Sequence, residues 1–313
     1  MILRDQLIAR RAFIKAVTPL LAFGLKTTKA AQHFAGPGPS AGINEAELRG
    51  QLLELINIER GLAGAPEVTL DELACDVASR HALDMITGKF LSHWGSDGLK
   101  PYQRYSFAGG TDYSAENVSA TDHIPSLKPD RVAAELINMN IRMHDEMPPN
   151  DGHRRAILGP EATHVGLGMA LKGNSLRLAE MFLARYAQID RLARESKPAS
   201  KLVIKGKLLN KDHIFQHADV YYEPLPVLNG ARQLAGHRYS LPTEFVTLRP
   251  ILSVSMRYAD GTTGTIDVGS HGHFRVPVTL FKRQAGIYTV VIWIKKKQRE
   301  QAFPVTEICI RAE

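Results

Sequence analysis

The spacing of apolar residues changes along this chain of 313 residues, and that change limits what it can fold into. Between residues 44 and 143, apolar side chains recur every three to four positions, which is typical of helices that bury one face. From residue 201 onward they alternate with polar residues or form short runs between Pro, Gly and Asn, as strands do. The sequence therefore predicts an α+β protein in which a domain containing helices precedes a smaller domain of strands.

Charge divides the chain at nearly the same place. Residues 1–40 carry a net charge of +5, residues 41–190 carry −7 and residues 191–313 carry +9, within a total of +7. An acidic domain thus precedes a basic one, a balance that bears on partners rather than on fold. The two cysteines are too few for a disulfide framework or a four-thiolate zinc site, and we interpret them as small buried side chains.

The first 35 residues are predicted to be an export signal. Arg10 and Arg11 precede an apolar stretch of about ten residues, which is too short to span a bilayer. The paired arginines resemble a twin-arginine signal, and cleavage after Ala30 or Ala35 would leave residues 36–42 as a linker rich in Gly and Pro. We expect an exported protein, periplasmic or extracellular, with no transmembrane anchor after cleavage; a cytosolic amphipathic leader is the alternative.

Helices are predicted to dominate the first domain, which we place at residues 43–190. Helical spacing predicts helices over about residues 44–60, 71–88 and 129–143, and strands are expected at residues 164–171 and 178–186. Asn44 and Asp71 are placed to cap the first two helices. Helices packed on a small sheet form a layered arrangement.

Four short motifs follow one another across this domain. They are Phe90-Leu91-Ser92-His93, Ala115-Glu116-Asn117, Gly152-His153-Arg154-Arg155-Ala156-Ile157-Leu158 and His164-Val165-Gly166-Leu167-Gly168, after a helix containing Leu55-Ile56-Asn57-Ile58-Glu59-Arg60. In this order, over about residues 45–188, they resemble the CAP superfamily of cysteine-rich secretory, antigen-five and pathogenesis-related-one proteins, also called SCP. The resemblance implies an α-β-α sandwich with a cleft lined by histidines and acids.

The same resemblance assigns the cleft residues. It makes His93 and His153 the two histidines and Glu116 the first acid. Imidazoles and a carboxylate suit one divalent ion, zinc above all, and they equally suit a hydrogen-bonded network without metal. The separations between these residues match no short metal-binding signature, so a metal ion here is an implication of the resemblance alone.

The second cleft acid departs from the family pattern. Relatives carry it after an aromatic residue on the helix before Gly-His, where this chain has Leu136 and Met139. We expect Glu146, within the inserted run 143–151, to take its place, with His144 as the next candidate. The alternative is a solvated loop stiffened by proline.

The second domain, residues 201–313 after a linker at 191–200, is predicted to be an immunoglobulin-like β-sandwich. Strand candidates span residues 201–209, 217–222, 244–256, 264–268, 273–280, 286–295 and 303–311. Residues 286–293 are continuously apolar, as in a central strand buried on both faces, and include a Gly-x-Tyr resembling a tyrosine corner. Lys295, Lys296, Lys297 and Arg299 are expected at a hairpin tip, either as a contact for an anionic surface or simply solvated.

These observations favour an exported, non-enzymatic binding module. Its cleft would hold a small apolar or metal-linked ligand, and its basic sandwich would attach to anionic lipid or polymer of the cell envelope. Nucleic acid is disfavoured, because the basic residues lack interleaved aromatics. A metal-assisted hydrolase of cell-wall peptide or polysaccharide is the alternative, with the ion on His93 and His153 and with Glu116 as ligand or base. A purely structural envelope protein is the third possibility.

The leader generates the first prediction. Mass spectrometry of the exported protein should find a mature start between Ala31 and Gly42, because small residues precede that stretch. Replacing Arg10 and Arg11 together with Lys should trap the precursor inside the cell, since the signal requires paired arginines. Efficient export of that double variant, or an intact leader on the exported protein, would contradict the twin-arginine assignment.

Overall fold

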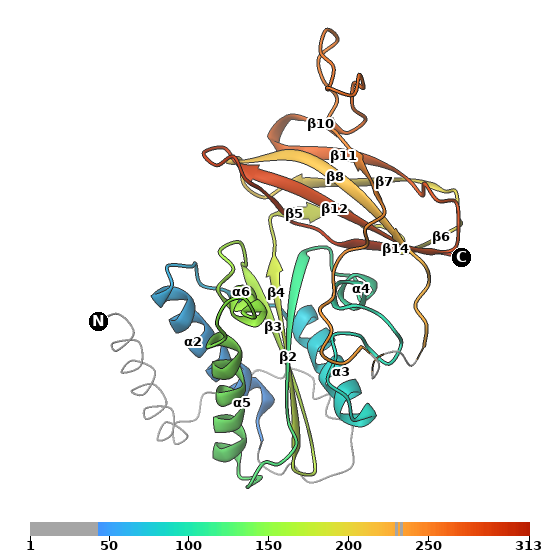
Figure 1. Ribbon diagram of the computed structural model, residues 1–313. Helices are drawn as coiled ribbons and strands as arrows, with labels where there is room; N and C mark the ends of the chain where they lie inside the picture. The colour runs from blue at the N-terminus through green and yellow to red at the C-terminus, as the bar shows by residue number, and fades with distance from the viewer. Residues whose placement is uncertain (1–42, 229–230, 232–233) are drawn as a thin grey trace.

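The structure, a computed structural model, describes residues 43–228, 231 and 234–313 (Figure 1). The export signal and linker predicted for residues 1–42 lie outside this part of the chain. Among the described residues, no helix has both the length and the apolar character needed to cross a membrane.

The first domain is a sheet between two layers of helices (Figure 1). The sheet has the order β1-β3-β4-β2, with β1 and β3 parallel and the other pairs antiparallel. Its strands are β1 (Thr69–Leu70), β2 (Tyr113–Thr121), β3 (His164–Lys172) and β4 (Ser175–Ala184). One face carries α2 (Glu45–Leu62), α5 (Pro129–His144) and α6 (Gly152–Leu158), and the other carries α3 (Glu72–Gly88) and α4 (Pro101–Phe107). This is the predicted α-β-α sandwich.

The helix caps form as the sequence predicts. Asn44 Oδ1 accepts a hydrogen bond from the Glu47 amide at 3.4 Å, and Asp71 Oδ1 accepts one from the Ala74 amide at 2.7 Å. Each bond satisfies an amide that the first turn of the helix leaves without a backbone partner. The three predicted helices are therefore confirmed, with ends shifted by a few residues at most.

Two glycines let α3 approach the sheet closely. A Cβ atom on Gly166 would lie 2.3 Å from the carbonyl carbon of Ala74, and one on Gly168 would lie 2.1 Å from that of Ala78. Both distances are far below van der Waals contact, so any side chain would push the helix off the sheet. The Gly-x-Gly of β3 is thus explained by helix packing.

The second domain consists of two sheets that pack face to face around one apolar core. The four-stranded sheet has the order β10-β11-β7-β5, and the six-stranded sheet the order β6-β14-β12-β8-β9 with β13 beside β12. The strands are β5 (Ala187–Ile189), β6 (Glu195–Ser196), β7 (Lys201–Leu208), β8 (His213–Glu223), β9 (Phe245–Leu248), β10 (Asp267–Val268), β11 (His273–Thr279), β12 (Gly286–Lys296), β13 (Ala302–Pro304) and β14 (Ile308–Ala312). The predicted β-sandwich is confirmed.

Three strand expectations differ from the structure. Of the expected strand 244–256 only β9 forms, and the chain then leaves the sheet at Pro250, which has no amide to donate. Of residues 264–268 only Asp267 and Val268 form a strand, β10, and Ile266 makes an isolated bridge with Pro250. The expected strand 303–311 is two strands, because a side chain replaces the backbone pairing between them. The Thr306 hydroxyl accepts a hydrogen bond from the Ile292 amide at 2.8 Å and donates one to Val290 O at 3.2 Å.

The first domain covers the outer face of the six-stranded sheet. Leu99 and Tyr102, beside and within α4, pack against Ile287 of β12 and Cys309 of β14. Strand β12 is consequently buried on both faces, as its continuous apolar run predicts. The Tyr288 hydroxyl donates to the Gln284 carbonyl at 3.2 Å, the contact expected of a tyrosine corner.

A carboxylate is buried at the boundary between the domains. Glu307, only 3 % exposed, accepts hydrogen bonds from the amide and the hydroxyl of Ser114, both at 2.9 Å. Burial raises the pKa of Glu307 to about 8, although the bonds from Ser114 oppose this shift. Protonated Glu307 is therefore the form that the docked domains favour.

Glu307 generates a prediction about pH. In the unfolded chain a Glu ionises near pH 4.3, so unfolding releases a proton from this site between about pH 4.3 and 8, and stability falls as pH rises through that range. Glu307→Gln keeps an acceptor for Ser114 and should abolish the fall. Between pH 5 and 8, the free energy of unfolding of this variant should rise by at least about 1 kcal/mol relative to that of wild type, as measured by urea unfolding.

The matched control is Glu300→Gln, which changes an exposed acid of the β12–β13 turn. Its stability should follow wild type at each pH. Parallel pH profiles for wild type and Glu307→Gln would show that Glu307 is ionised in the folded protein throughout.

Candidate functional site

A buried carboxylate, Glu116, forms the centre of the candidate site. It lies on β2, is 5 % exposed, and places Oε2 2.6 Å from Nη2 of Arg104 in α4. Its other oxygen, Oε1, lies 3.1 Å from Nδ1 of His93, which donates to it. The strand, the helix and the loop after α3 thus meet at one side chain.

Arg104 also fixes the loop that carries His93. Its Nη1 donates to the carbonyls of His93 at 2.7 Å and Leu99 at 2.8 Å. A planar guanidinium can make these bonds together with the carboxylate contact because its donors point in fixed directions. Arg104 therefore sets both the charge of Glu116 and the position of His93.

A third histidine, His81 of α3, lies behind this pair. Its Nε2 donates to Ser92 O at 2.9 Å and lies 3.8 Å from Glu116 Oε1, and the side chain is fully buried. Burial is the main cause that lowers the pKa of His81 to about 4, followed by the positive charge of Arg104. His81 is consequently a neutral ring at physiological pH.

The surroundings of Glu116 keep it ionised. Burial alone would raise its pKa, but the nearby Arg104, His81 and His93 outweigh burial and lower the pKa to about 2. A buried carboxylate with this pKa is a permanent negative charge in the site.

The second histidine has a carboxylate of its own. Nδ1 of His153, at the start of α6, lies 2.5 Å from Oε1 of Glu146, and the Glu146 Oε2 accepts from the His153 amide at 3.0 Å. The imidazole rings of His93 and His153 are 6.5 Å apart between centroids. The structure thus brings four of the proposed residues together: His93, Glu116, His153 and Glu146.

A second buried acid, Glu180, is linked to His153 through Asn117. Asn117 on β2 donates through Nδ2 to the His153 carbonyl at 3.2 Å and to Glu180 at 3.2 Å, and Asn140 donates to the other Glu180 oxygen at 3.0 Å. Burial raises the pKa of Glu180 to about 7, against the two amide hydrogen bonds. No motif in the sequence marks Glu180, which is the one acid of the mostly apolar strand β4.

The remaining candidate, His144, contacts residues of the neighbouring helices. His144 ends α5, where Nδ1 is 3.1 Å from Asp145 Oδ1 and 3.9 Å from Glu59 Oε1, and its carbonyl accepts from Arg154 at 2.6 Å. These contacts connect α5 to α2 and α6 and do not join His144 to His93 or Glu116.

The second domain contributes directly to the site. The connection between β8 and β9, residues 224–244, is called the strap here; its described part descends along the first domain in Figure 1. The hydroxyl of its Tyr239 accepts a hydrogen bond from the Glu116 amide at 2.8 Å. The Tyr239 ring stands edge-on to the His93 ring, with centroids 4.8 Å apart. Its Ser240 carbonyl accepts from Lys100, and its Leu234 carbonyl accepts from Ser92. Tyr239 was missed because it lies about 120 residues beyond Glu116 in sequence.

The hydrogen bonds of Glu116 bear on its predicted role as a metal ligand. Both oxygens of Glu116 are already held, by Arg104 and by His93, so Glu116 does not fit the predicted role of metal ligand. Among the described residues no group of three His, Cys, Asp or Glu is arranged to hold a metal ion. A zinc ion held by His93, His153 and Glu116 would have to displace these contacts of the carboxylate.

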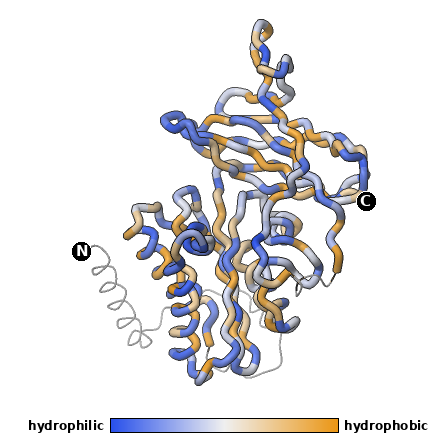
Figure 2. The backbone as a smooth tube through the Cα atoms, viewed as in Figure 1, coloured by the Kyte–Doolittle hydropathy of each residue, from blue (hydrophilic) through white to orange (hydrophobic). Residues whose placement is uncertain are grey.

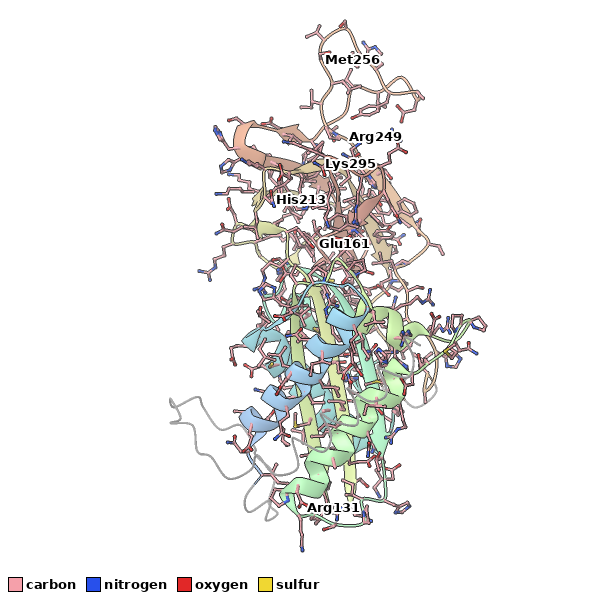
Figure 3. The ribbon with its side chains drawn as sticks, turned by 90° about the vertical axis from the view of Figure 1, so that its left-hand side faces the viewer. Arg131, Glu161, His213, Arg249, Met256 and Lys295 are labelled. Carbon is pink, nitrogen blue, oxygen red and sulfur yellow. The ribbon has the colours of Figure 1, made fainter. Side chains whose placement is uncertain are left out.

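The basic hairpin tip also differs from a free surface patch. Lys296 and Arg299 approach Glu161 of the first domain, with nitrogen–oxygen distances of 3.2 and 3.7 Å. Figure 3 shows Glu161 below Lys295 and His213, near the boundary between the two domains. The tip itself is strongly hydrophilic (Figure 2). Lys295 and Lys297 have no ion pair within the described part of the chain.

Comparisons with known proteins give a family for the first domain. Residues 53–186 match the model of the cysteine-rich secretory protein (CAP) family. No curated protein matches the chain.

Similar solved structures come from bacteria. They include an outer surface protein of Borrelia burgdorferi (16 % identity, TM-score 0.37, covering 46 % of this chain and 96 % of that one). An extracellular protein containing an SCP domain from Bacillus anthracis is 23 % identical, with TM-score 0.33 and coverage of 47 % and 45 %. A cysteine-rich secretory protein of Staphylococcus aureus is 14 % identical, with TM-score 0.29 and coverage of 46 % and 40 %.

The buried ion pair generates a prediction. Arg104→Met should lower the free energy of unfolding by about 3–5 kcal/mol at pH 7, because it leaves the ionised Glu116 buried without its cation. Adding Glu116→Gln should recover part of this loss. Urea unfolding measures both, and Arg142→Met, which breaks an exposed pair with Glu135, should cost less than about 1 kcal/mol.

Acid unfolding tests the same pair independently. The pKa of Glu116 is about 2 in the folded protein, so its contribution is complete above about pH 4.3 and is lost as pH falls toward 2. Glu116→Gln should be less sensitive to pH in this window. An Arg104→Met variant as stable as wild type would refute the view that a buried charge pair holds the site.

Proposed function

We propose that this protein, which carries a CAP domain at residues 53–186, is an exported binding module that holds a small ligand between His93 and His153 without transforming it. One observation carries the proposal: each histidine donates Nδ1 to its own carboxylate, Glu116 at 3.1 Å and Glu146 at 2.5 Å. These bonds fix the orientation of both rings, as they do wherever a carboxylate positions a histidine.

The fixed rings define what such a ligand needs. A neutral imidazole that donates Nδ1–H to a carboxylate has an acceptor at Nε2. A ligand with hydroxyl or amide donors matches two such acceptors, and the Tyr239 ring beside His93 offers it an apolar wall. The favoured ligand is therefore a small molecule with a polar end and an apolar body.

The potential nucleophiles of this region support binding rather than covalent catalysis. His81 contacts the carbonyl of Ser92, while the Ser92 hydroxyl turns toward the strap, so the two do not form a nucleophile–base pair. Both cysteines are buried, and burial raises the pKa of Cys75 and raises that of Cys309 to about 12. Thiols in that state are poor nucleophiles.

A weakly held divalent ion is the second candidate ligand. It is favoured by the same carboxylate–histidine pairs, which are typical partners of histidines that ligate metals. His93 and His153 would hold the ion through Nε2, and the ion would supply the polarising charge that a hydrolase of cell-wall polymers requires. Two histidines provide only half of the ligands of a tetrahedral zinc site, so the ligand or water would complete it.

Attachment to an anionic envelope surface is the proposed role of the second domain. Residues 191–313 carry a net charge of +9, and few of these cations are used against the acidic first domain. Lys296 and Arg299 pair with Glu161, and Arg194 and Arg238 donate to Gly110 O and to Asn150 Oδ1. Most of the charge therefore remains available to an anionic partner outside the cell.

Native mass spectrometry of the exported protein, recovered from the cells that make it, tests the binding proposal. We expect a small bound compound that is lost in His93→Ala/His153→Ala and kept in the control His164→Ala, whose ring contacts Thr163 outside the cleft. Retention of the compound by the double variant would rule out the cleft as its site. Titration with zinc chloride, followed by calorimetry, separates the second candidate: heat of binding that needs both histidines would favour the ion.

A further inference from the structure

A narrow projection extends from the second domain at the end farthest from the first. Residues 249–266, called the finger here, connect β9 to β10 and rise above the sandwich in Figure 1. Its two sides are joined by backbone hydrogen bonds, from Ile251 N to Ile266 O at 2.8 Å and from Leu252 N to Thr263 O at 2.9 Å. The finger is therefore built by its own contacts.

The base of the finger is braced by side chains. The Tyr258 hydroxyl donates to Pro250 O at 2.8 Å, and Arg249 pairs with Asp260 while lying over the Tyr258 ring. Gly264 has φ +83°, and a Cβ there would lie 1.9 Å from Pro250 O. Only glycine permits this approach, so the narrow neck is specified by the sequence.

The finger presents large apolar side chains to solvent, from Ile251 near its base to Val254 and Met256 farther out. Val254 is fully exposed, and Ile251 and Met256 are 58 % and 55 % exposed. The Met256 amide bonds to Ser253 O at 2.8 Å, which closes a turn at the tip. Figure 3 labels Met256 at the extremity of the molecule, away from the first domain. Single exposed apolar residues are ordinary, but three on one braced projection indicate a contact surface.

Cations lie on the sheet into which the finger leads. The outward residues of β7 and β11 include Lys201, Lys205, Lys207 and Arg275, all exposed, with Lys205 and Arg275 paired in register. No ion pair of these four, or of Arg257 in the finger, occurs among the described residues. Two acids, Asp190 and Asp267, flank this face at its edges.

We propose that the finger inserts Ile251, Val254 and Met256 into the interfacial layer of an anionic lipid surface, with the cations of β7 and β11 supplying electrostatic attraction. This rests on the attachment role proposed above and names its chemistry. Weak apolar insertion combined with basic charge is the usual way in which a protein binds reversibly to such a surface.

The shape of the finger favours lipid over a protein partner. A stable protein interface buries roughly 800 Å² on each side, with matched packing. A narrow convex projection with three such side chains cannot supply that area, whereas a bilayer accepts it without a complementary pocket.

Co-sedimentation of the full mature protein with vesicles tests the proposal. Vesicles of phosphatidylglycerol and phosphatidylcholine should bind it at about 0.05 M salt, and binding should fall steeply by about 0.5 M. Val254→Asp/Met256→Asp should weaken binding at least about tenfold, since it places charge at the inserted tip. Lys205→Glu/Lys207→Glu should weaken it to a similar degree.

The matched control is Leu62→Asp/Leu127→Asp, which changes two similarly exposed apolar residues of the first domain. It should bind vesicles like wild type, and thermal unfolding should show that both double variants remain folded. His93→Ala/His153→Ala should also bind vesicles normally, so that failure of the cleft proposal and failure of this one are told apart.

Several results would overturn the proposal. They are the absence of vesicle binding by wild type at low salt, equal binding by the Val254→Asp/Met256→Asp variant, and equal binding to neutral vesicles. A second copy of the chain is the other occupant to consider. If sedimentation shows a dimer that the tip variant dissociates, the finger is a self-association surface and the lipid proposal fails.

Discussion

The candidate site depends on one charge held inside the protein. Glu116 lies on the middle of β2 where water does not reach it, and Arg104 meets it at 2.6 Å. Removing a carboxylate from water is costly unless a cation and hydrogen bonds replace the solvent. The same arginine positions the His93 backbone, and the Glu116 amide is bonded by Tyr239 from the other domain. The ion pair thus ties a strand, a helix, a loop and the strap into one arrangement.

The boundary between the domains is not held by attraction between their opposite net charges. Opposite net charges suggest electrostatic attachment, yet the main contact is apolar: Leu99 and Tyr102 against Ile287 and Cys309. The buried Glu307 relies on hydrogen bonds from Ser114 rather than on an ion pair with any described residue. Burial of apolar area, the hydrogen bonds of Glu307 and the Lys100–Glu223 ion pair at 2.7 Å together hold the domains, and the basic charge remains largely on surfaces that face outward.

The sequence predicts the layers of this fold well and its polar strand poorly. Helical spacing and the caps at Asn44 and Asp71 locate the long helices, because burial of one face and satisfied end amides are local demands. Strand β2 escapes prediction because Ser114, Glu116 and Asn117 are buried polar residues that break the apolar alternation. The polar residues that β2 contributes to the site are therefore the reason that the sequence does not predict it as a strand.

Within the site, the motifs locate His93, Glu116 and His153, and the inserted loop provides Glu146. What a linear pattern cannot provide are contacts made across the fold. Arg104 and His81 read as ordinary surface and core residues of their helices, and Tyr239 lies in another domain. The role of each residue is apparent only after tertiary packing brings it to Glu116.

The strap has a consequence for how this architecture can be inherited. Because the Tyr239 hydroxyl of the second domain accepts a hydrogen bond from the Glu116 amide and its ring contacts His93, the aromatic wall beside His93 is encoded far from the domain that contains His93. Recombination that exchanged the sandwich for another module would remove that wall as well. The two domains are therefore expected to change together, because a mutation in the strap can alter the surroundings of His93 while the histidines and acids stay as they are.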